Sequence, residues 1–526
     1  MAETISRAEV KRHNKEEDAW IVINDCVYDV TKFAMLHPGG EKLLLQYAGE
    51  DATEDFYGLH KQSVLDKFGP RLLKGKLPAT EAPVETNEAD GVSAWGKISK
   101  VPYAEMPYWR GWKSPYYNES HVRFRKYVRE FYDKEVREIA VNGETTHEAP
   151  SLELMQTISK AGLMHTQLGP GEHLNLLPMP AGLKPEEFDY FHSMILHEEG
   201  ARVMAPGFFD GIYAGFTISV PALLHFGTEK MKKTVLPEIL AGRQRSCLAI
   251  TEAFAGSDVA NLRTTATKSA DGSHYIVNGT KKWITNGTFA DYAVTAVRTG
   301  GAGAGGVSML FIPLKSEGVN AKIIKAAYSH SAGTSYLTFE NVKVPVENLM
   351  GKENQGFALV MANFNMERLH LVQGVVACMR YVTEECFKWA TQRKVFGKPL
   401  MQQPVIRKKL GCMIADVESC SAWLELVTYQ VQNMSFEEQN RQLGGTIGLL
   451  KYQATTAAQN VARDAVEIFG GRGLTQTGMG RVISCFHRTI IGPHIFGGAA
   501  DVVLDLGVRQ AVKAFAPDLD SPESKL

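Results

Sequence analysis

The sequence predicts a multidomain α+β protein, and three observations support this. A chain of 526 residues is too long for a single hydrophobic core. Apolar residues recur every three or four positions over residues 120–242 and 356–515, as in helices that bury one face. Over residues 246–345 they alternate with a period of two, as in strands. We therefore expect helices, then a β domain, then helices.

The first eighty residues predict a separate small domain. Two short β-prone runs, Trp20–Ile23 and Val27–Val30, are joined across Asn24–Asp25. His37 stands in a His-Pro-Gly-Gly turn, and His60 follows after a helix-turn-helix pattern. Two histidines in this arrangement suit the opposite faces of a planar metal cofactor.

This segment resembles the haem-binding domain of cytochrome b5, whose hallmark is the His-Pro-Gly-Gly turn. The resemblance implies that His37 and His60 are the two axial ligands of a haem b. Iron with two histidine ligands has no open coordination site. We therefore expect this domain to transfer electrons rather than to activate oxygen.

The stretch Leu248–Asn286 predicts one wall of a flavin site. Its apolar start, Leu248–Ile250, is β-prone and is followed by a turn at Gly256–Asp258, where backbone amides and a hydroxyl can face a phosphate. The indole of Trp283 is suited to cover a flat ring. The Thr285 hydroxyl, two residues further on, is expected on the same face of the strand.

Further strands are expected beside this wall. The pair Asn278–Gly279 predicts a two-residue type I′ hairpin turn between residues 273–277 and 280–284. Other strands are expected at 292–298, 307–312 and 336–342. The run Gly301–Gly306 fits the pattern G-x-G-x-x-G, but it joins two predicted strands and begins no helix. It is therefore expected to be a connection and not a dinucleotide site.

At the wall residues the sequence resembles the acyl-CoA dehydrogenase family, whose signature segments here are Ile250–Asp258 and Trp283–Asn286. The resemblance covers about residues 115 to 515. It implies an N-terminal helical domain, a middle β domain and a C-terminal helical bundle, with FAD as cofactor, an acyl-CoA as substrate, and a homodimer or homotetramer. The FAD contacts that it implies are Leu248, Ile250, Thr251, Ser257, Trp283, Thr285, Arg393, Phe396, Gly470 and Gly471.

Two groups among these residues lie far from the wall in the sequence. Arg393 and Phe396 match the family segment that reaches the FAD of a neighbouring subunit, and a guanidinium suits a pyrophosphate because its donors form a charged fork. Gly470 and Gly471 match a glycine-rich turn where backbone approaches FAD.

Oxidising an acyl thioester requires a base for the α proton. Many relatives carry this glutamate near the C-terminus, where this chain has Phe496–Ala499. A second family location corresponds here to Glu367, with Arg368 beside it as a residue for the pocket or the CoA end of the substrate. Gly497 would leave space for the Glu367 carboxylate. The alternative is an exposed Glu-Arg pair at a helix start, held by the helix dipole.

Composition excludes several classes of protein. The formal net charge of −1 argues against nucleic-acid binding. Seven cysteines without a C-x-x-C pair argue against zinc and against a disulfide framework. There is no run of eighteen apolar residues and no apolar signal segment at the N-terminus, so no membrane span is expected. The ending Ser524-Lys525-Leu526 predicts recognition by a peroxisomal import receptor, and thus a peroxisomal location.

A polar, acidic linker is expected after residue 77, because residues 77–90 hold few apolar side chains. The aromatic-rich stretch Trp95–Tyr117 suits packing of the end of the linker onto the second domain. The expected domains are 1–77 (haem module), 78–114 (linker and connector), 115–244 (N-terminal helical), 245–352 (middle β), 353–515 (C-terminal helical) and 516–526 (tail with the targeting signal).

These inferences predict FAD-dependent α,β-dehydrogenation of an acyl-CoA in fatty-acid or branched-acyl breakdown, with electrons relayed to the fused haem. One alternative is a flavin oxidase of an acyl-CoA, or of another carbon acid or nitro compound. Another is a haem- and flavin-binding protein without turnover. The acyl chain and the final electron acceptor stay open.

Overall fold

The computed structural model describes residues 3–37, 40–53, 56, 60, 62–78, 98–327 and 329–519. They fall into two compact units: residues 3–78 with 471–484, and residues 98–470 with 485–519. The predicted linker from residue 79 to 97, the centre of the His-Pro-Gly-Gly turn and the targeting tripeptide lie outside the described residues.

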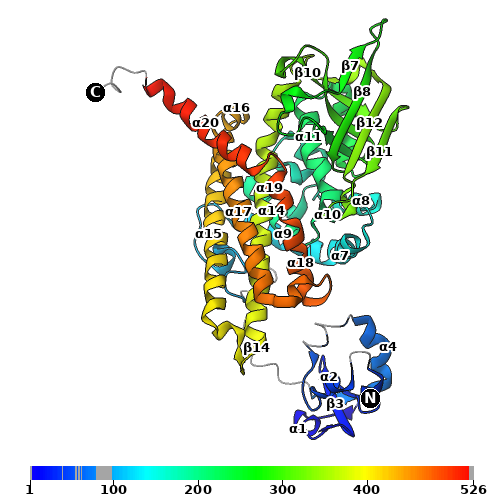
Figure 1. The fold of residues 1–526 in the computed structure, drawn as a ribbon, viewed down its shortest axis with the longest axis vertical. Coiled ribbons are helices and arrows are strands. Elements are labelled where there is room, and N and C mark those ends of the chain that lie inside the picture. Colours follow the sequence, from blue (N-terminus) through cyan, green and yellow to red (C-terminus); the bar gives the residue numbers. More distant parts are fainter. Residues whose placement is uncertain are drawn as a thin grey trace. The chain divides into compact units, whose positions relative to one another are not determined.

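The N-terminal unit holds a five-stranded sheet in the order β1-β5-β4-β3-β2 (Figure 1). The predicted hairpin is confirmed: β3 pairs antiparallel with β4 across Asn24 and Asp25, whose φ angles of 50° and 58° are those of a type I′ turn. The elements are β1 (Glu3–Thr4), α1 (Arg7–Val10), β2 (Asn14–Lys15), β3 (Asp18–Ile23), β4 (Cys26–Asp29), α2 (Glu41–Leu45), α4 (Gln62–Leu72) and β5 (Leu73–Lys76).

The second unit begins with a connector and a helical region. Several helices start at side-chain caps such as Asn118, Ser151 and Asp189, which accept hydrogen bonds from otherwise unpaired backbone amides. They are α6 (Glu119–Phe131), α7 (Arg137–Thr146), α8 (Leu152–Lys160), α9 (Tyr190–Ala201), α10 (Pro206–Phe209), α11 (Gly215–Phe226), α12 (Glu229–Thr234) and α13 (Leu236–Leu240), with π-helical turns at Tyr132–Val136 and Asp210–Ala214.

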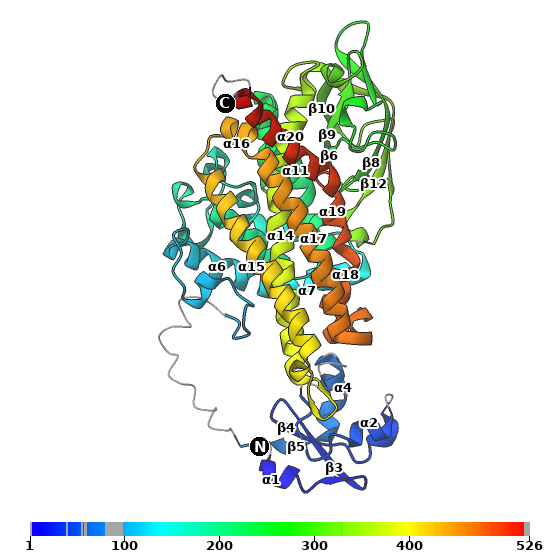
Figure 2. The same cartoon turned by 60° about the vertical axis from the view of Figure 1, so that its left-hand side comes forward.

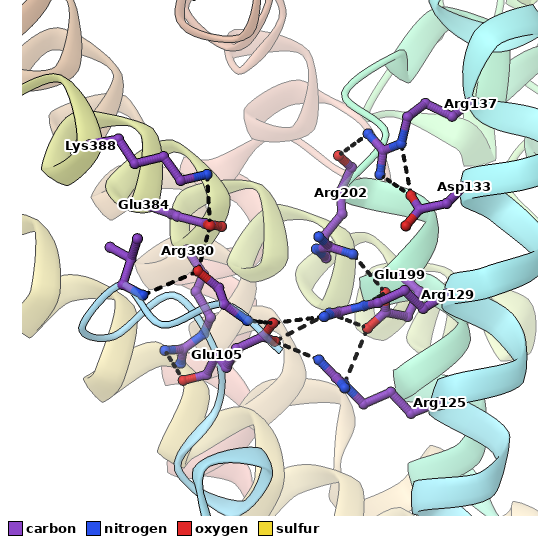
Figure 3. A network of polar contacts seen from close by, with 12 residues as sticks. Glu105, Arg125, Arg129, Asp133, Arg137, Glu199, Arg202, Arg380, Glu384 and Lys388 are labelled. Carbon is purple, nitrogen blue, oxygen red and sulfur yellow. Dashed lines mark hydrogen bonds and ion pairs between the residues drawn. The ribbon is translucent and has the colours of Figure 1, made fainter. Parts of the chain in front are cut away.

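A buried ion-pair network fixes the connector to these helices (Figure 3). Glu105 of the connector accepts hydrogen bonds from Arg125 at 2.6 Å and from Arg129 at 2.7 Å, and Arg129 also pairs with Glu199 of α9. Trp109 is buried beside them, with Arg125 over its ring. The predicted packing of the aromatic connector onto the second domain is thus confirmed for its described part.

The middle domain is an eight-stranded sheet in the order β11-β12-β8-β7-β9-β10-β13, with β6 paired to β9 (Figure 1). The three strands predicted after residue 290 are confirmed, and Gly301–Gly306 joins β9 to β10 without starting an α-helix. The strands are β6 (Ser246–Ala249), β7 (Thr265–Lys268), β8 (His274–Ile284), β9 (Tyr292–Arg298), β10 (Val307–Pro313), β11 (Val319–Ile323), β12 (Ser335–Pro345) and β13 (Leu349–Met350).

The hairpin predicted at Asn278–Gly279 is wrong. Strand β8 continues through both residues and pairs with β7 on one side and β12 on the other. Gly279 is required for a different reason: a Cβ there would lie 2.6 Å from the Cα of Thr264. Asn278 exchanges hydrogen bonds with Asn341 across an irregularity in β12. The pair thus marks a close approach between strands instead of a turn.

The C-terminal domain is built around the long helix α14, which packs against α15 and α17 (Figure 2) and also against α9. The apolar stripe predicted along α14 is largely buried, with Met379, Val382 and Cys386 at 0% exposure. The elements are α14 (Gly356–Gln392), β14 (Lys394–Val395), β15 (Lys398–Pro399), α15 (Pro404–Gln432), α16 (Phe436–Gln442), α17 (Gly444–Phe469), α18 (Arg481–Thr489), α19 (Ile491–Ile495) and α20 (Ala500–Leu519).

One helical stretch among the described residues, Pro206–Phe226, has the length and mean hydropathy of a membrane span. Of that window, 61% is buried within the protein. A bent pair, Gly478–Ile495 with Ala500–Lys513, passes the same test only if it is counted as one span. Burial of Pro206–Phe226 inside the fold is what a core helix requires, and this stretch forms part of the cavity described next.

Candidate active site

A cavity of about 300 Å³ lies between α9, α11 and α14. Most of its wall is apolar, with Leu196, Met204, Ile218, Leu371 and Val375 among the lining side chains. The polar and ionisable groups on the wall are Tyr132, Gln167, His197, Asp210, Tyr213, Thr217, Thr285, Glu367, His370, Cys378 and Thr489. Such a pocket, apolar with a few placed polar groups, is typical of a small-molecule site.

Glu367 lies eleven residues into α14 and lines the cavity. Its Oε2 is buried and has no hydrogen-bond partner among the residues that the structure describes. Burial raises the pKa of Glu367 to about 7, although the cations Arg368 and Lys451 favour the ionised form. The alternative of an exposed Glu-Arg pair at a helix start is wrong, because both residues are away from the helix end and Arg368 is only 8% exposed.

Asp210 is a second carboxyl on the cavity wall. Burial, with a smaller contribution from the neighbouring anion Glu144, raises the pKa of Asp210 to about 7. A general base must be ionised to accept a proton. The cationic neighbours of Glu367 therefore suit a base better than the anionic neighbour of Asp210.

Arg368 does not line the cavity. Its Nε donates to the carbonyl of Gly497 at 2.7 Å, and its guanidinium lies over the Phe364 ring at 5.5 Å. Lys451 donates to the next carbonyl, that of Gly498. The observed role of Arg368 is to hold this turn beside Glu367, and its predicted contact with substrate stays a prediction.

The two segments predicted to form one flavin wall do come together. The Lys282 amide donates to the carbonyl of Thr251 at 2.8 Å, and the buried Lys281 ammonium donates to the carbonyl of Ile250 at 3.0 Å and pairs with Glu252 at 2.8 Å. Glu252 also accepts the amides of Arg263 and Thr264. The end of β6, the following loop and the end of β8 therefore form one rigid unit.

Trp283 is a bulge residue in β8, with φ of 65° and 52% exposure. Consecutive residues of β12, Ser335 and Tyr336, pair with Ile284 and Lys282, so that Trp283 is the extra residue. The alternation of faces is interrupted there, so the shared face expected for Trp283 and Thr285 does not follow from strand periodicity and stays a prediction. Thr285 lines the cavity, whereas the indole is displayed on the outside.

Asn286 ties this wall to the helical domain. Its Oδ1 accepts the Gly215 amide at 2.9 Å, and its Nδ2 donates to the carbonyls of Asp210 and Ala332. Thr285 is thereby fixed at the cavity that also contains Glu367. An exposed flat ring, a hydroxyl at the cavity and a turn with open space around Gly256 fit a flavin with its phosphates.

The other predicted FAD residues are divided between the wall and the outer surface. Leu248 is half-buried in β6, and Ile250 is buried. Ser257, Arg393, Gly470 and Gly471 are exposed, and Phe396 is 96% exposed. The described chain brings none of these last five residues to the cavity.

His37 and His60 lie together in the N-terminal unit, with ring centroids 5.9 Å apart. The Nδ1 of His37 is 3.2 Å from the Gly40 carbonyl, and the Nδ1 of His60 is 3.3 Å from the Phe56 carbonyl. Such bonds fix the tautomer and leave each Nε2 available to a metal. Both rings fit the predicted haem ligation.

Sequence reasoning missed the polar cavity residues His197 and His370. His370 stands three residues after Glu367, which places both on one face of α14. That spacing was a usable signal for His370. His197 comes from α9, and nothing local in the sequence places it at this cavity.

Comparison with known proteins agrees with this architecture. Residues 118–243, 247–342 and 354–512 match the N-terminal, middle and C-terminal domains of acyl-CoA dehydrogenase. Residues 6–78 match the cytochrome b5-like Heme/Steroid binding domain.

Curated relatives and solved structures cover most of the chain. The acyl-CoA dehydrogenase apdG of Emericella nidulans is 43% identical over 80% of this chain and 97% of its own length. The acyl-CoA dehydrogenase AFT10-1 of Alternaria alternata is 37% identical over 79% and 96%. A probable acyl-CoA dehydrogenase structure from Mycobacterium abscessus is 27% identical, with a TM-score of 0.67 over 76% of this chain and all of that one. The chain is therefore a member of the acyl-CoA dehydrogenase family, an FAD-dependent oxidoreductase of CH–CH donors in acyl-CoA substrates, fused to a cytochrome b5-like haem domain.

Proposed function

We propose that Glu367 is the base that removes the α proton of a bound acyl-CoA, and that the fused haem receives the electrons. The observation that carries the first part is the buried Glu367 Oε2, without a partner, in the cavity that Thr285 also lines. A carboxylate whose pKa is near 7 is poised to accept a proton at neutral pH.

Each residue of the site has a definable task in this reaction. A bound FAD, held at the wall that contains Trp283 and Thr285, would supply the acceptor for the hydride of the β carbon. The apolar wall excludes water from the reacting carbons, which strengthens the electrostatic interactions inside. Arg368 and Lys451 stabilise the Glu367 carboxylate and hold the Gly497–Gly498 turn next to it.

The relay to haem rests on covalent fusion and on the two histidines. A short tether raises the effective concentration of an acceptor to about the mM range. His37 and His60 leave no open position on a bound iron, which suits transfer of one electron at a time. The two electrons from each acyl-CoA would thus require two successive transfers, with the haem reoxidised by an external electron acceptor between them.

Anaerobic stopped-flow spectroscopy of the full chain, loaded with FAD and haem, tests both parts. Straight and branched acyl-CoAs are mixed with the enzyme while flavin and haem bands are followed together. We expect flavin reduction first and haem reduction afterwards. Flavin reduction without any haem reduction would refute the relay, and hydrogen peroxide formed in air at the rate of turnover would favour the oxidase.

Assembly, location and pathway belong to the same proposal. Phe396 is almost fully exposed, and Arg393 lies three residues before it in the sequence. This exposure supports a homodimer or homotetramer in which both residues contact the FAD of a neighbouring subunit. The ending Ser524–Leu526 supports a peroxisomal location and the breakdown of fatty or branched acyl groups there.

Light scattering after gel filtration tests the oligomeric state. Imaging of a fluorescent fusion with and without Leu526 tests location, and equal distribution of the two would contradict the peroxisomal assignment.

A further inference from the structure

Two histidines stack within the cavity wall. The rings of His197 on α9 and His370 on α14 have centroids 4.3 Å apart and planes 20° from parallel. The Nε2 atoms of both are buried, and neither finds a hydrogen-bond partner in the part of the chain that the structure describes. These are the only two histidines on the described wall.

The tautomer of His197 follows from the hydrogen bond of its Nδ1 atom. Its Nδ1 lies 2.8 Å from the Ser193 carbonyl, which can only accept, so Nδ1 carries the hydrogen. The Nε2 of the neutral ring is then an acceptor that lacks a donor. His370 Nε2 lacks a partner as well; with the hydrogen of the neutral ring on Nε2 it is a donor, and with the hydrogen on Nδ1 it is an acceptor.

Both rings are uncharged at neutral pH. Burial lowers the pKa of His197 to about 4 and the pKa of His370 well below its usual value. A charge on His197 would also disfavour a charge on His370, the ring stacked on it. The pair therefore suits a neutral polar group and gives no charge to hold a carboxylate.

Several other polar side chains on the wall already have partners, whereas Glu367 is assigned to the base. The hydroxyls of Tyr132 and Tyr213 are 3.0 Å apart, and Gln167 donates to Tyr132 at 3.4 Å. Thr217 and Thr489 donate to backbone carbonyls of their own helices. The histidine pair is left with an acceptor at His197 Nε2 and, in the tautomer with hydrogen on Nε2, a donor at His370, and an alkyl chain can pair with neither.

The pair lies along the acyl chain rather than at the thioester. His370 is three residues beyond Glu367, about 4.5 Å along the helix axis. The lining continues along α14 to Cys378, two further turns beyond His370. A base acting at the α carbon therefore places His197 and His370 beside carbons beyond the β carbon.

We propose that the preferred acyl-CoA carries a hydroxyl on its chain beyond the β carbon, which donates to His197 Nε2 and accepts from His370 Nε2–H. This inference rests on the proposed function of the same site. A hydroxyl meets both needs because it is donor and acceptor at once, whereas a ketone oxygen lacks the donor.

The test compares matched substrates on the FAD-loaded full chain. Each plain acyl-CoA from hexanoyl to decanoyl is paired with analogues that carry a hydroxyl, or an oxo group, at one position from C4 outward. We expect kcat/KM to be about tenfold higher for the best hydroxyl analogue than for the plain ester, with no such gain for the oxo analogue. Equal values for hydroxylated and plain esters would overturn the inference.

Variants assign the preference to the pair. His197→Leu and His370→Leu are expected to bring the hydroxyl-to-plain ratio of kcat/KM to about one, while His197→Gln retains part of it. His225→Leu is a control outside the cavity, where His225 stacks on Phe436, and it should leave the ratio unchanged. A ratio that survives both leucine variants, with FAD content intact, would exclude the pair as its source.

The proposed function and this inference fail in distinguishable ways. If no acyl-CoA reduces the flavin, the proposed function fails, and the same substrate pairs are then compared by dissociation constant in calorimetric titration. Tighter binding of the hydroxyl analogue, lost in His370→Leu, would still support the inference. Equal binding of the two would overturn it.

Discussion

The turn glycine Gly497 and the acid Glu367 share one small space: a Cβ placed on Gly497 would lie 3.7 Å from Oε1 of Glu367 and 3.4 Å from Cγ of Arg368. These are ordinary contact distances. The sequence predicted that glycine at 497 leaves space for a carboxylate from the long helix, and this placement is confirmed. The carboxylate from α14 occupies the region that a longer side chain at residue 497 would have to enter.

Replacing Glu367 by Gln should remove the base while keeping the shape of the pocket. We expect the rate of flavin reduction by acyl-CoA to fall about 10²- to 10⁴-fold, the usual contribution of a general base, with FAD content unchanged. Anaerobic stopped-flow absorbance measures this rate of flavin reduction. Asp210→Asn removes the other carboxyl of the cavity and should retain the rate within about tenfold. The reverse pattern in the two variants would make Asp210 the base.

The reaction should depend on pH in the neutral range. Burial raises the pKa of Glu367 from its usual acidic range to about 7, and only the carboxylate accepts a proton. The second-order rate of flavin reduction should therefore fall about tenfold for each pH unit below 7 and level off above it. The profile is measured from pH 5.5 to 9. A rate that stays constant down to pH 5.5 would show that the base is not this buried carboxyl.

Gly497→Ala should lower the free energy of unfolding while changing the rate of flavin reduction only slightly. Gly497 has φ of 63°, a conformation that costs a residue with a Cβ about 1 kcal/mol or somewhat more. The Cβ itself fits at ordinary contact distance, so flavin reduction should change only a few-fold. Chemical unfolding gives the free energy. Gly182→Ala is the matched control, with φ of 66° and no atom within 4 Å of its Cβ, and should lose a similar free energy without a change in rate.

Local signals predicted the fold where short-range interactions decide it. The turn at Asn24–Asp25 and the strand Tyr292–Arg298 form as expected, because turn chemistry and period-two alternation act over a few residues. The same rule failed at Asn278–Gly279, where close packing against Thr264 and pairing with β12 decide the geometry. A single sequence does not distinguish a glycine required by the close approach of two strands from a glycine required by a turn.

The residues of the candidate site also differ in whether the sequence alone could predict them. Glu367 and Thr285 were predicted from motif and resemblance, and both line the cavity. His197 was not, because its place beside His370 depends on how α9 packs against α14. Sequence periodicity shows which face of a helix is buried, but it does not show which partner helix meets that face.

His60→Ala should remove haem and spare the flavin. His37 and His60 lie 5.9 Å apart, with their Nδ1 atoms near backbone carbonyls, so loss of one ring leaves a bound iron with a single strong axial ligand from the pair. We expect the haem content of the purified chain to fall at least about tenfold, measured from the Soret band and a pyridine haemochrome assay. His13→Ala is the control, because His13 stacks on Trp20 and contacts Asp18 in the same domain. Full haem content in His60→Ala, or equal losses of haem in both variants, would contradict the ligand assignment. Unchanged flavin reduction by acyl-CoA in the haem-free variant would show that the two redox centres load independently.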